Sequence, residues 1–155
     1  MAFVSDHGVL LDRLDQALWL APKPTRDLFA KIIAGACRRV PVLTQSGHAT
    51  KMSRLLESGA WADAVLALVE LELPGWSLRR LVREEGTWTC SLSRQPNLPV
   101  GLDDTADGSH DAMPLAILRA FLQARRMALA ESRPAALVPV VEQGSAELVC
   151  CENFV

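Results

Sequence analysis

The spacing of the apolar residues changes twice along the chain, and this change constrains the fold more than any other feature. Up to about residue 73, apolar residues recur every three to four positions, which is the period of an amphipathic helix. From Thr87 to Ser93 the period is two, because Trp88, Cys90 and Leu92 alternate with Thr and Ser. The helical period then returns. The pattern predicts an α+β fold, in which an N-terminal helical pair is followed by a helix, an antiparallel β-hairpin and a long helix packed in layers.

Prolines and capping residues divide the helical part of the sequence. Pro22 and Pro24 separate the first helix from a second one, which Thr25 can cap. We expect this second helix to continue to residue 40, because Pro41 disfavours the helical conformation of its predecessor. Two more helices are expected before the hairpin, around residues 52–56 and over residues 61–71.

The hairpin turns at residues 84–86, and two registers are open to it. A two-residue loop would place Arg79 and Arg83 on the same side as Trp88, where burying two arginines costs more than burying one. We therefore predict a three-residue loop with glycine in the left-handed position, which leaves Arg80 on the inner face beside a carboxylate or at a rim. The predicted cross-strand pairs are Val82 with Trp88, Arg80 with Cys90, and Leu78 with Leu92.

An acidic segment, residues 102–111, precedes the last helix, which runs to about Leu129 with Arg125 on its apolar stripe. Asp111 is the expected N-cap of this helix. The segment begins like a calcium loop, but Pro114 stands where the final bidentate glutamate belongs. Capping and solvation are the preferred interpretation, so no cofactor is expected. The alternative is a metal site, whose ligands would be Asp103, Asp107, His110 and Asp111.

Three arginines of the hairpin region, Arg79, Arg83 and Arg94, are candidates for phosphate contacts. With the Thr and Ser side chains between them, they could form a polar, locally basic sheet face. In the predicted register no aromatic residue lies on that face, so nucleic-acid bases would have no stacking platform. A solvated sheet face is the preferred interpretation, and nucleic-acid binding is the alternative.

Composition excludes several classes of protein. A formal net charge of −2 and a pI near 5.9 lack the basic excess of a general binder of nucleic acids or anionic membranes. No apolar run approaches the roughly 20 residues of a membrane span, and the N-terminal residues do not have the charge order of a secretory signal. We therefore expect a cytoplasmic protein without membrane contact.

The cysteines show no C-x-x-C spacing, which argues against a zinc knuckle or a redox dithiol. Cys37 and Cys90 lie among apolar residues and are expected in the core as small hydrophobes. Cys150 and Cys151 lie near the end of the chain, where exposure is expected.

We expect a single α+β domain over residues 1–133, which comprises a helical part (1–57) and an αββα unit (58–133). Residues 134–155 form a C-terminal segment of extra strands or a mobile tail. A lone hairpin leaves strand edges unpaired, and 50% of the residues are hydrophobic. We therefore predict a protein partner or a homodimer, formed through the sheet or through the apolar runs 137–141 and 148–151.

Five pieces of sequence carry a resemblance to known proteins. They are Ser58-Gly59-Ala60-Trp61, Leu71-Glu72-Leu73-Pro74-Gly75-Trp76, Leu78-Arg79-Arg80-Leu81, Trp88-Thr89-Cys90-Ser91-Leu92-Ser93-Arg94 and Pro114-Leu115-Ala116-Ile117-Leu118. Through them, about half of the chain resembles a family of uncharacterised hypothetical proteins of rhizobium-like α-proteobacteria. The order of elements is also similar, more distantly, to a phage-associated helix-sheet-helix sandwich domain. The resemblance implies an α+β fold and a bacterial cytoplasmic protein, and it brings no catalytic residue.

Motifs typical of enzymes are missing from the sequence. There is no G-x-S-x-G nucleophile motif, and His7, His48 and His110 all fall in expected loops or at expected ends of elements. We therefore predict a non-enzymatic protein-interaction or regulatory module. The alternatives are a nucleic-acid-binding adaptor that uses the arginines of the hairpin, and a metal-dependent enzyme at the acidic segment.

Overall fold

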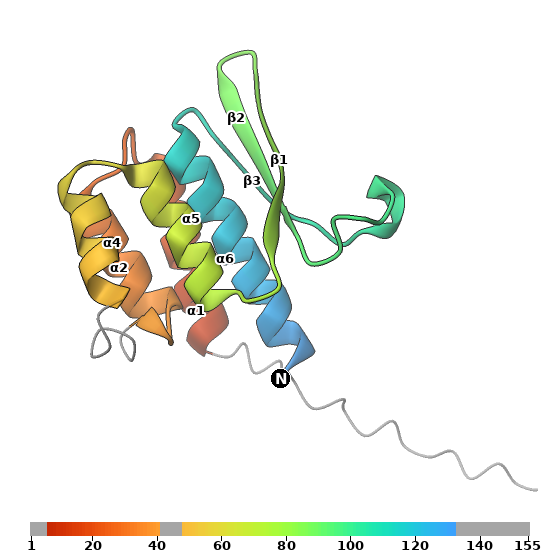
Figure 1. Ribbon diagram of the computed structural model, residues 1–155, viewed down its shortest axis with the longest axis horizontal. Helices are drawn as coiled ribbons and strands as arrows, with labels where there is room; N and C mark the ends of the chain where they lie inside the picture. Colours follow the sequence, from red (N-terminus) through yellow and green to blue (C-terminus); the bar gives the residue numbers. More distant parts are fainter. Residues whose placement is uncertain (1–5, 41–47, 133–155) are drawn as a thin grey trace, which may run out of the picture.

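The computed structural model describes residues 6–40 and 48–132, and these form helices packed against one antiparallel sheet. Figure 1 shows α6 between the other helices on one side and the sheet on the other. The α+β class and the order of helix, hairpin and long helix are as predicted. In chain order the elements are α1 (Asp6–Leu20), α2 (Arg26–Ala36), α4 (His48–Glu57), α5 (Trp61–Glu72), β1 (Ser77–Glu84), β2 (Thr87–Ser93), a short 3₁₀ helix (Val100–Leu102), β3 (Ala106–His110) and α6 (Met113–Glu131).

The long helix α6 is the centre of the core. It packs against β2 and β3 on one side and against α1 and α5 on the other. Because both sides are covered, most of its apolar side chains lose all contact with solvent. Those that are 0% exposed include Leu115, Ile117, Leu118, Phe121 and Leu122.

Helix α2 begins as predicted but ends earlier. The Leu28 N–H donates to Thr25 Oγ1 at 3.2 Å, which makes Thr25 the N-cap. The helix stops at Ala36 rather than at residue 40. The reason lies in α5, where the buried Glu72 carboxylate accepts the backbone N–H groups of three residues that a longer helix would have used internally. Glu72 binds Arg38 at 3.0 Å, and Arg39 and Val40 at 2.7 Å each.

The acidic segment contains a third strand that the sequence analysis missed. Strand β3 pairs antiparallel with β2, so the sheet order is β1-β2-β3. The predicted cap is also wrong, because Ala112 occupies the N-cap position of α6 and makes no side-chain capping bond. Pro114 lies in the first turn of α6, as expected. The inward-facing residues of β3 include Ala106 and Gly108, which are too small to produce an apolar strand pattern.

Gly108 brings the backbone of β3 directly against α6. A Cβ atom at this position would lie 2.3 Å from the Ala120 nitrogen and 2.5 Å from the Ala116 carbonyl oxygen. No side chain fits at such distances, so glycine is required for the close approach of strand and helix. The sequence does not predict this contact, because it depends on how β3 and α6 are positioned relative to each other.

The predicted hairpin loop is wrong. The turn has two residues, Glu85 and Gly86, with φ of 49° and 86°, which is the pattern of a type I′ turn. Leu81 therefore lies opposite Cys90, where the prediction had Arg80. Leu78 does lie opposite Leu92 as predicted, because the register shifts at a β-bulge between Leu78 and Arg80.

The two-residue loop does not bury two arginines, which is why the reasoning behind the predicted register failed. Arg83 lies opposite Trp88 but remains exposed, with its guanidinium carbon 5.9 Å from the centre of the Trp88 ring. Arg79 lies within the β-bulge and therefore has no residue of β2 directly opposite it. Arg80 is exposed and pairs with Glu84 at 3.5 Å, so it does not occupy the inner face.

The apolar side of β2 is as predicted at its inner end. Cys90 and Leu92 are completely buried, and Trp88 is half-buried toward the turn. Residues 134–155, including Cys150 and Cys151, lie outside the described residues. Across residues 6–40 and 48–132, no helix has the length and apolar character needed to cross a membrane.

Candidate interaction surface

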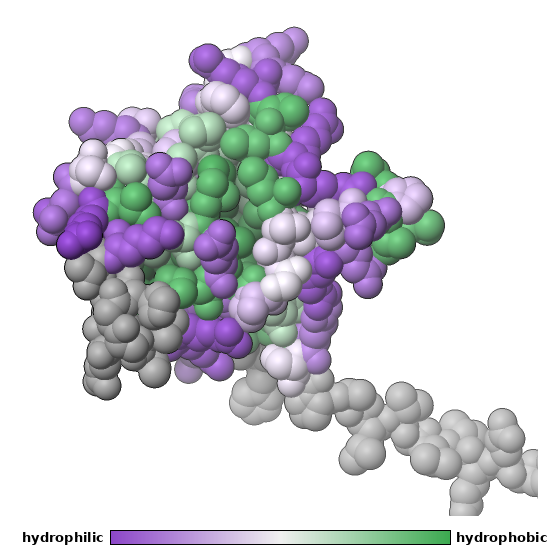
Figure 2. Space-filling model, viewed as in Figure 1, coloured by the Kyte–Doolittle hydropathy of each residue, from purple (hydrophilic) through white to green (hydrophobic). Residues whose placement is uncertain are grey.

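The connection between β2 and β3 projects from the sheet and carries exposed aliphatic side chains at its tip. We call residues 95–104 the apolar loop. Leu98 is 37% exposed, Val100 75% and Leu102 73%. Figure 1 shows this loop standing away from the body of the molecule, and Figure 2 shows apolar atoms at its tip among hydrophilic ones. Single exposed aliphatic residues are common on protein surfaces, and here three of them lie on one projecting loop.

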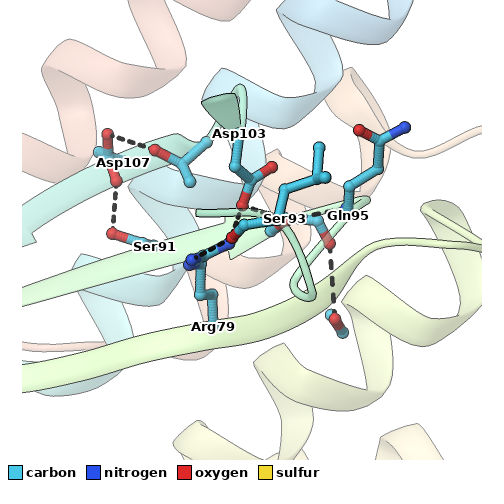
Figure 3. Close-up of polar contacts among 9 residues, drawn as sticks. Arg79, Ser91, Ser93, Gln95, Asp103 and Asp107 are labelled. Carbon is cyan, nitrogen blue, oxygen red and sulfur yellow. Dashed lines mark hydrogen bonds and ion pairs between the residues drawn. The ribbon is translucent and has the colours of Figure 1, made fainter. Parts of the chain in front are cut away.

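A buried ion pair fixes the apolar loop to the sheet (Figure 3). Arg79 of β1 pairs with the carboxylate of Asp103, whose side chain is only 2% exposed, and also donates to the Leu98 carbonyl oxygen at 2.7 Å. The Ser93 hydroxyl donates to Asp103 at 2.6 Å and accepts the Gln95 N–H at 2.9 Å. The beginning, middle and end of the loop are therefore each bound to the sheet.

Local backbone hydrogen bonds shape the tip between these anchors. The Leu98 N–H donates to the Gln95 carbonyl at 3.0 Å, and the Leu102 N–H donates to the Pro99 carbonyl at 2.9 Å. Pro99 also has a fixed φ angle, which restricts the unfolded loop. The loop therefore presents its apolar side chains in one ordered conformation.

Arg94 connects the base of the apolar loop to the end of α6. Its guanidinium forms a bidentate pair with Glu131, and its central carbon lies 5.1 Å from the centre of the Trp76 ring. The hydrogen bonds from Arg94 lower the pKa of Glu131. A hollow of about 320 Å³ opens beside this pair, lined by Arg94, Gln95, Leu102, Asp103 and Asp104.

The three arginines proposed to contact phosphate do not form one free basic face. Arg79 is committed to Asp103 and Arg94 to Glu131. Arg83 lies over Trp88 near the turn. Two of these positive charges are therefore neutralised within the protein, one of them by an aspartate from the acidic segment.

The four candidate metal ligands are dispersed. Asp103 binds Arg79, and Asp107 accepts hydrogen bonds from Ser91 and from Thr105. His110 is 6% exposed, and its Nδ1 accepts the Ala112 N–H at 2.9 Å. The remaining candidate, Asp111, accepts a 3.4 Å hydrogen bond from Thr87. Within the described part of the chain, no three His, Cys, Asp or Glu side chains are grouped so that they could hold a metal ion.

Other exposed apolar residues lie on the helical side of the molecule, where α1 carries Val9, Leu10, Trp19 and Leu20. Trp19 of α1 is 59% exposed, and the guanidinium of Arg119 lies 4.8 Å from its ring centre. Arg119 in turn binds Asp15 through both carboxylate oxygens, at 2.9 and 3.2 Å. The hollow around them has a volume of about 480 Å³, but the charges that line it already pair with one another.

The sequence analysis did not single out Leu98, Val100 or Leu102. The available signal was their position after the hairpin, in a Pro-containing stretch with neither helical nor strand period that runs into the start of the acidic segment. Apolar residues in such a stretch have no regular face through which to enter the core. Leu98, Val100 and Leu102 are therefore exposed.

Comparison with known proteins adds no assignment. No family model, no curated protein and no solved structure matches the chain. Similarity therefore identifies neither a family nor an activity, and the resemblance to rhizobium-like hypothetical proteins stays an expectation from sequence.

Proposed function

We propose that this protein is a non-enzymatic interaction module that binds another protein through the apolar loop. The observation that carries this proposal is the exposure of Val100 (75%) and Leu102 (73%) on a loop that a buried ion pair holds in place. Burying such a side chain in a partner's pocket contributes about 1.5–3 kcal/mol. Because the loop is already ordered, little conformational entropy is lost on binding.

The charges beside the loop favour a protein partner with a basic rim around an apolar pocket. Asp104 is exposed next to Leu102, and the positive charge of Arg94 is paired with Glu131. The exposed carboxylate of Asp104 disfavours the negative surface of a membrane and the phosphates of a nucleic acid. Arg79 is paired with Asp103 and is therefore not free to bind phosphate, which also favours a protein partner.

The test compares proteins retained from a lysate of the source cells by the immobilised full chain and by variants. The loop variant carries Val100→Ser and Leu102→Ser. The matched control is Leu20→Ser, because Leu20 is 71% exposed on α1 and Leu102 is 73% exposed. We expect a specific protein to be retained by the wild type and by the control, and its affinity for the loop variant to fall at least about tenfold.

Two results would contradict the proposal. One is equal retention of the same proteins by the wild type and the loop variant. The other is salt-sensitive retention of nucleic acid that is lost on Arg83→Gln, which would support the nucleic-acid adaptor instead. Arg83 is the suitable position for this substitution because it is exposed and makes no ion pair with a described residue.

A further inference from the structure

One arginine of the core has no partner for its charge among residues 6–40 and 48–132. Arg125 of α6 is only 9% exposed, and its Nε and Nη2 atoms are buried without a hydrogen-bond partner among the described residues. Neither does it form an ion pair with any described carboxylate. A buried guanidinium without a counter-charge is strongly destabilising, so its presence calls for a physical explanation.

The two unpartnered atoms form the edge of the guanidinium that binds carboxylates and phosphates side-on. The same protein shows how this edge is used elsewhere. In Arg119, which precedes Arg125 by six residues on α6, Nε and Nη2 bind the two carboxylate oxygens of Asp15 at 2.9 and 3.2 Å. In Arg125 the equivalent edge is free of described partners.

A second unpartnered donor belongs to the same region. His7, in the first turn of α1, has its Nε2 atom buried without a partner among the described residues. Burial is the largest cause of the lowered pKa of His7, and the positive charges of Arg38 and Arg125 lower it further. The N-terminal end of α1 adds its own partial positive charge.

The charge of the buried Glu72 carboxylate acts on Cys37, as does the charge of Arg125, but Glu72 forms no ion pair with a described residue. Glu72 accepts three backbone N–H groups, from Arg38, Arg39 and Val40. Cys37 does not give the cluster a nucleophile, because burial and the charge of Glu72 raise the pKa of its thiol. Binding of an anion is therefore the chemistry that the cluster supports, rather than catalysis.

We propose that the Nε/Nη2 edge of Arg125 binds an oxyanion, a phosphate or carboxylate group, with His7 as a second donor. The bidentate edge matches two oxygens of such a group, and the positive charges around it compensate the negative charge on burial. This site is distinct from the apolar loop and does not depend on the function proposed for it. Because the donor atoms are buried, binding requires a local movement of the chain around Arg125.

The first test is thermal unfolding of the full chain at constant ionic strength, with chloride replaced by inorganic phosphate, sulfate or acetate. We expect a saturable rise in Tm, on the order of 5 °C when the anion is far above its Kd. A response to phosphate and sulfate identifies a phosphate-class ligand, and a response to acetate alone identifies a carboxylate. The matched control is Arg80→Gln, which should keep the response because Arg80 and its partner Glu84 are exposed, 62% and 75% respectively.

Arg125→Met should abolish the rise in Tm. In chloride alone, this variant should be at least as stable as the wild type, because it removes an uncompensated buried charge. Calorimetric titration with the anion that stabilises the wild type should show an affinity at least about tenfold lower for Arg125→Met, and a smaller loss for His7→Phe.

Three outcomes would overturn the proposal. The first is no response of the wild type to any of the three anions, and the second is a full response of Arg125→Met. The third is a strong loss of stability of Arg125→Met in chloride alone, which would show that a carboxylate of the chain itself already occupies the edge.

Discussion

Arginine side chains in this protein differ in how far their ion pairs are exposed to solvent. The pair of Arg79 with Asp103 is almost excluded from solvent, with side chains 17% and 2% exposed. The pair of Arg80 with Glu84 lies in solvent, at 62% and 75%. Water screens the second pair but hardly screens the first, so adjacent residues of one strand contribute very differently to stability.

Substitution of Arg79 by Met should lower the free energy of unfolding by about 3 kcal/mol, because it leaves the Asp103 carboxylate buried without its counter-charge. Arg80→Met should lower it by no more than about 1 kcal/mol. Urea unfolding of both variants measures the difference. Equal losses at the two positions would show that the apolar loop is not anchored through this pair.

The buried thiols should resist modification. Burial, with a smaller contribution from Asp107, raises the pKa of Cys90 to about 12, and burial raises the pKa of Cys37 as well. Since only thiolates react quickly, alkylation of both residues should be as slow as unfolding of the protein. Mass-spectrometric mapping of iodoacetamide adducts over time measures the rates, and rapid labelling of Cys37 or Cys90 in the folded protein would contradict this expectation.

The same pKa shift affects stability at high pH. A thiol whose folded-state pKa is raised stabilises the fold fully at pH values below its unfolded pKa, near 8.5. That contribution is lost progressively as the pH rises above the unfolded value toward the folded one. The wild type should therefore lose more stability than Cys90→Ala between neutral and strongly alkaline pH, as measured by urea unfolding.

At the scale of elements, the contact between β3 and α6 decides the layout of the sheet. β3 has few large side chains, so its position depends on backbone hydrogen bonds to β2 and on close approach to α6. Adding one carbon atom at such a tightly packed position is enough to disrupt the contact. Apolar residues of α6, in contrast, are distributed over several turns and tolerate conservative exchange.

Gly108→Ala should be strongly destabilising, by about 2–3 kcal/mol or more, because its Cβ would lie 2.3 Å from backbone of α6. Gly101→Ala is the matched control: nothing lies within 4 Å of a Cβ there. Its stability should change by less than about 1 kcal/mol. Denaturant unfolding of the two variants provides the comparison, and a neutral Gly108→Ala would mean that β3 does not pack on α6 as described.

At the scale of the whole molecule, the third strand changes the case for self-association. The prediction of a homodimer rested partly on a lone hairpin, whereas β3 covers one side of β2. The outer strand β1 carries exposed charges at Arg80, Arg83 and Glu84, which oppose pairing with another strand. A dimer would therefore need the edge of β3, an apolar surface or the C-terminal segment rather than the edge of β1.

Light scattering over a range of concentrations tests the prediction of a homodimer. We expect the full chain to dimerise, and a chain that ends at Arg133 to be monomeric if residues 134–155 form the contact. The double substitution Val100→Ser and Leu102→Ser serves as the parallel measurement for the apolar loop. A full-length chain that is monomeric at all concentrations would contradict the homodimer and leave a different protein as the partner.

Periodicity in the sequence was sufficient for every element with a one-sided apolar pattern. The stripe that includes Leu115 and Phe121 indicated α6, and the alternation of Cys90 and Leu92 indicated β2 and its buried side. Thr25 marked the start of α2 through local chemistry, which depends only on neighbours in the chain, whereas the cap expected for α6, Asp111, was wrong. The correctly predicted features are local, and the sequence by itself therefore determined them.

Only the tertiary structure decided where the charges and the small residues lie. β3 has a weak apolar pattern because Gly108 faces a helix that is close in space, and α2 ends early because Glu72 reaches it from α5. The pairing of Arg79 with Asp103 joins residues from two different candidate sites, and Arg125 finds no hydrogen-bond partner for its Nε and Nη2 atoms in the part of the chain that the structure describes. The physical reason is common to these cases: desolvation and steric fit act between segments distant in the chain, and no local pattern records which segments will meet.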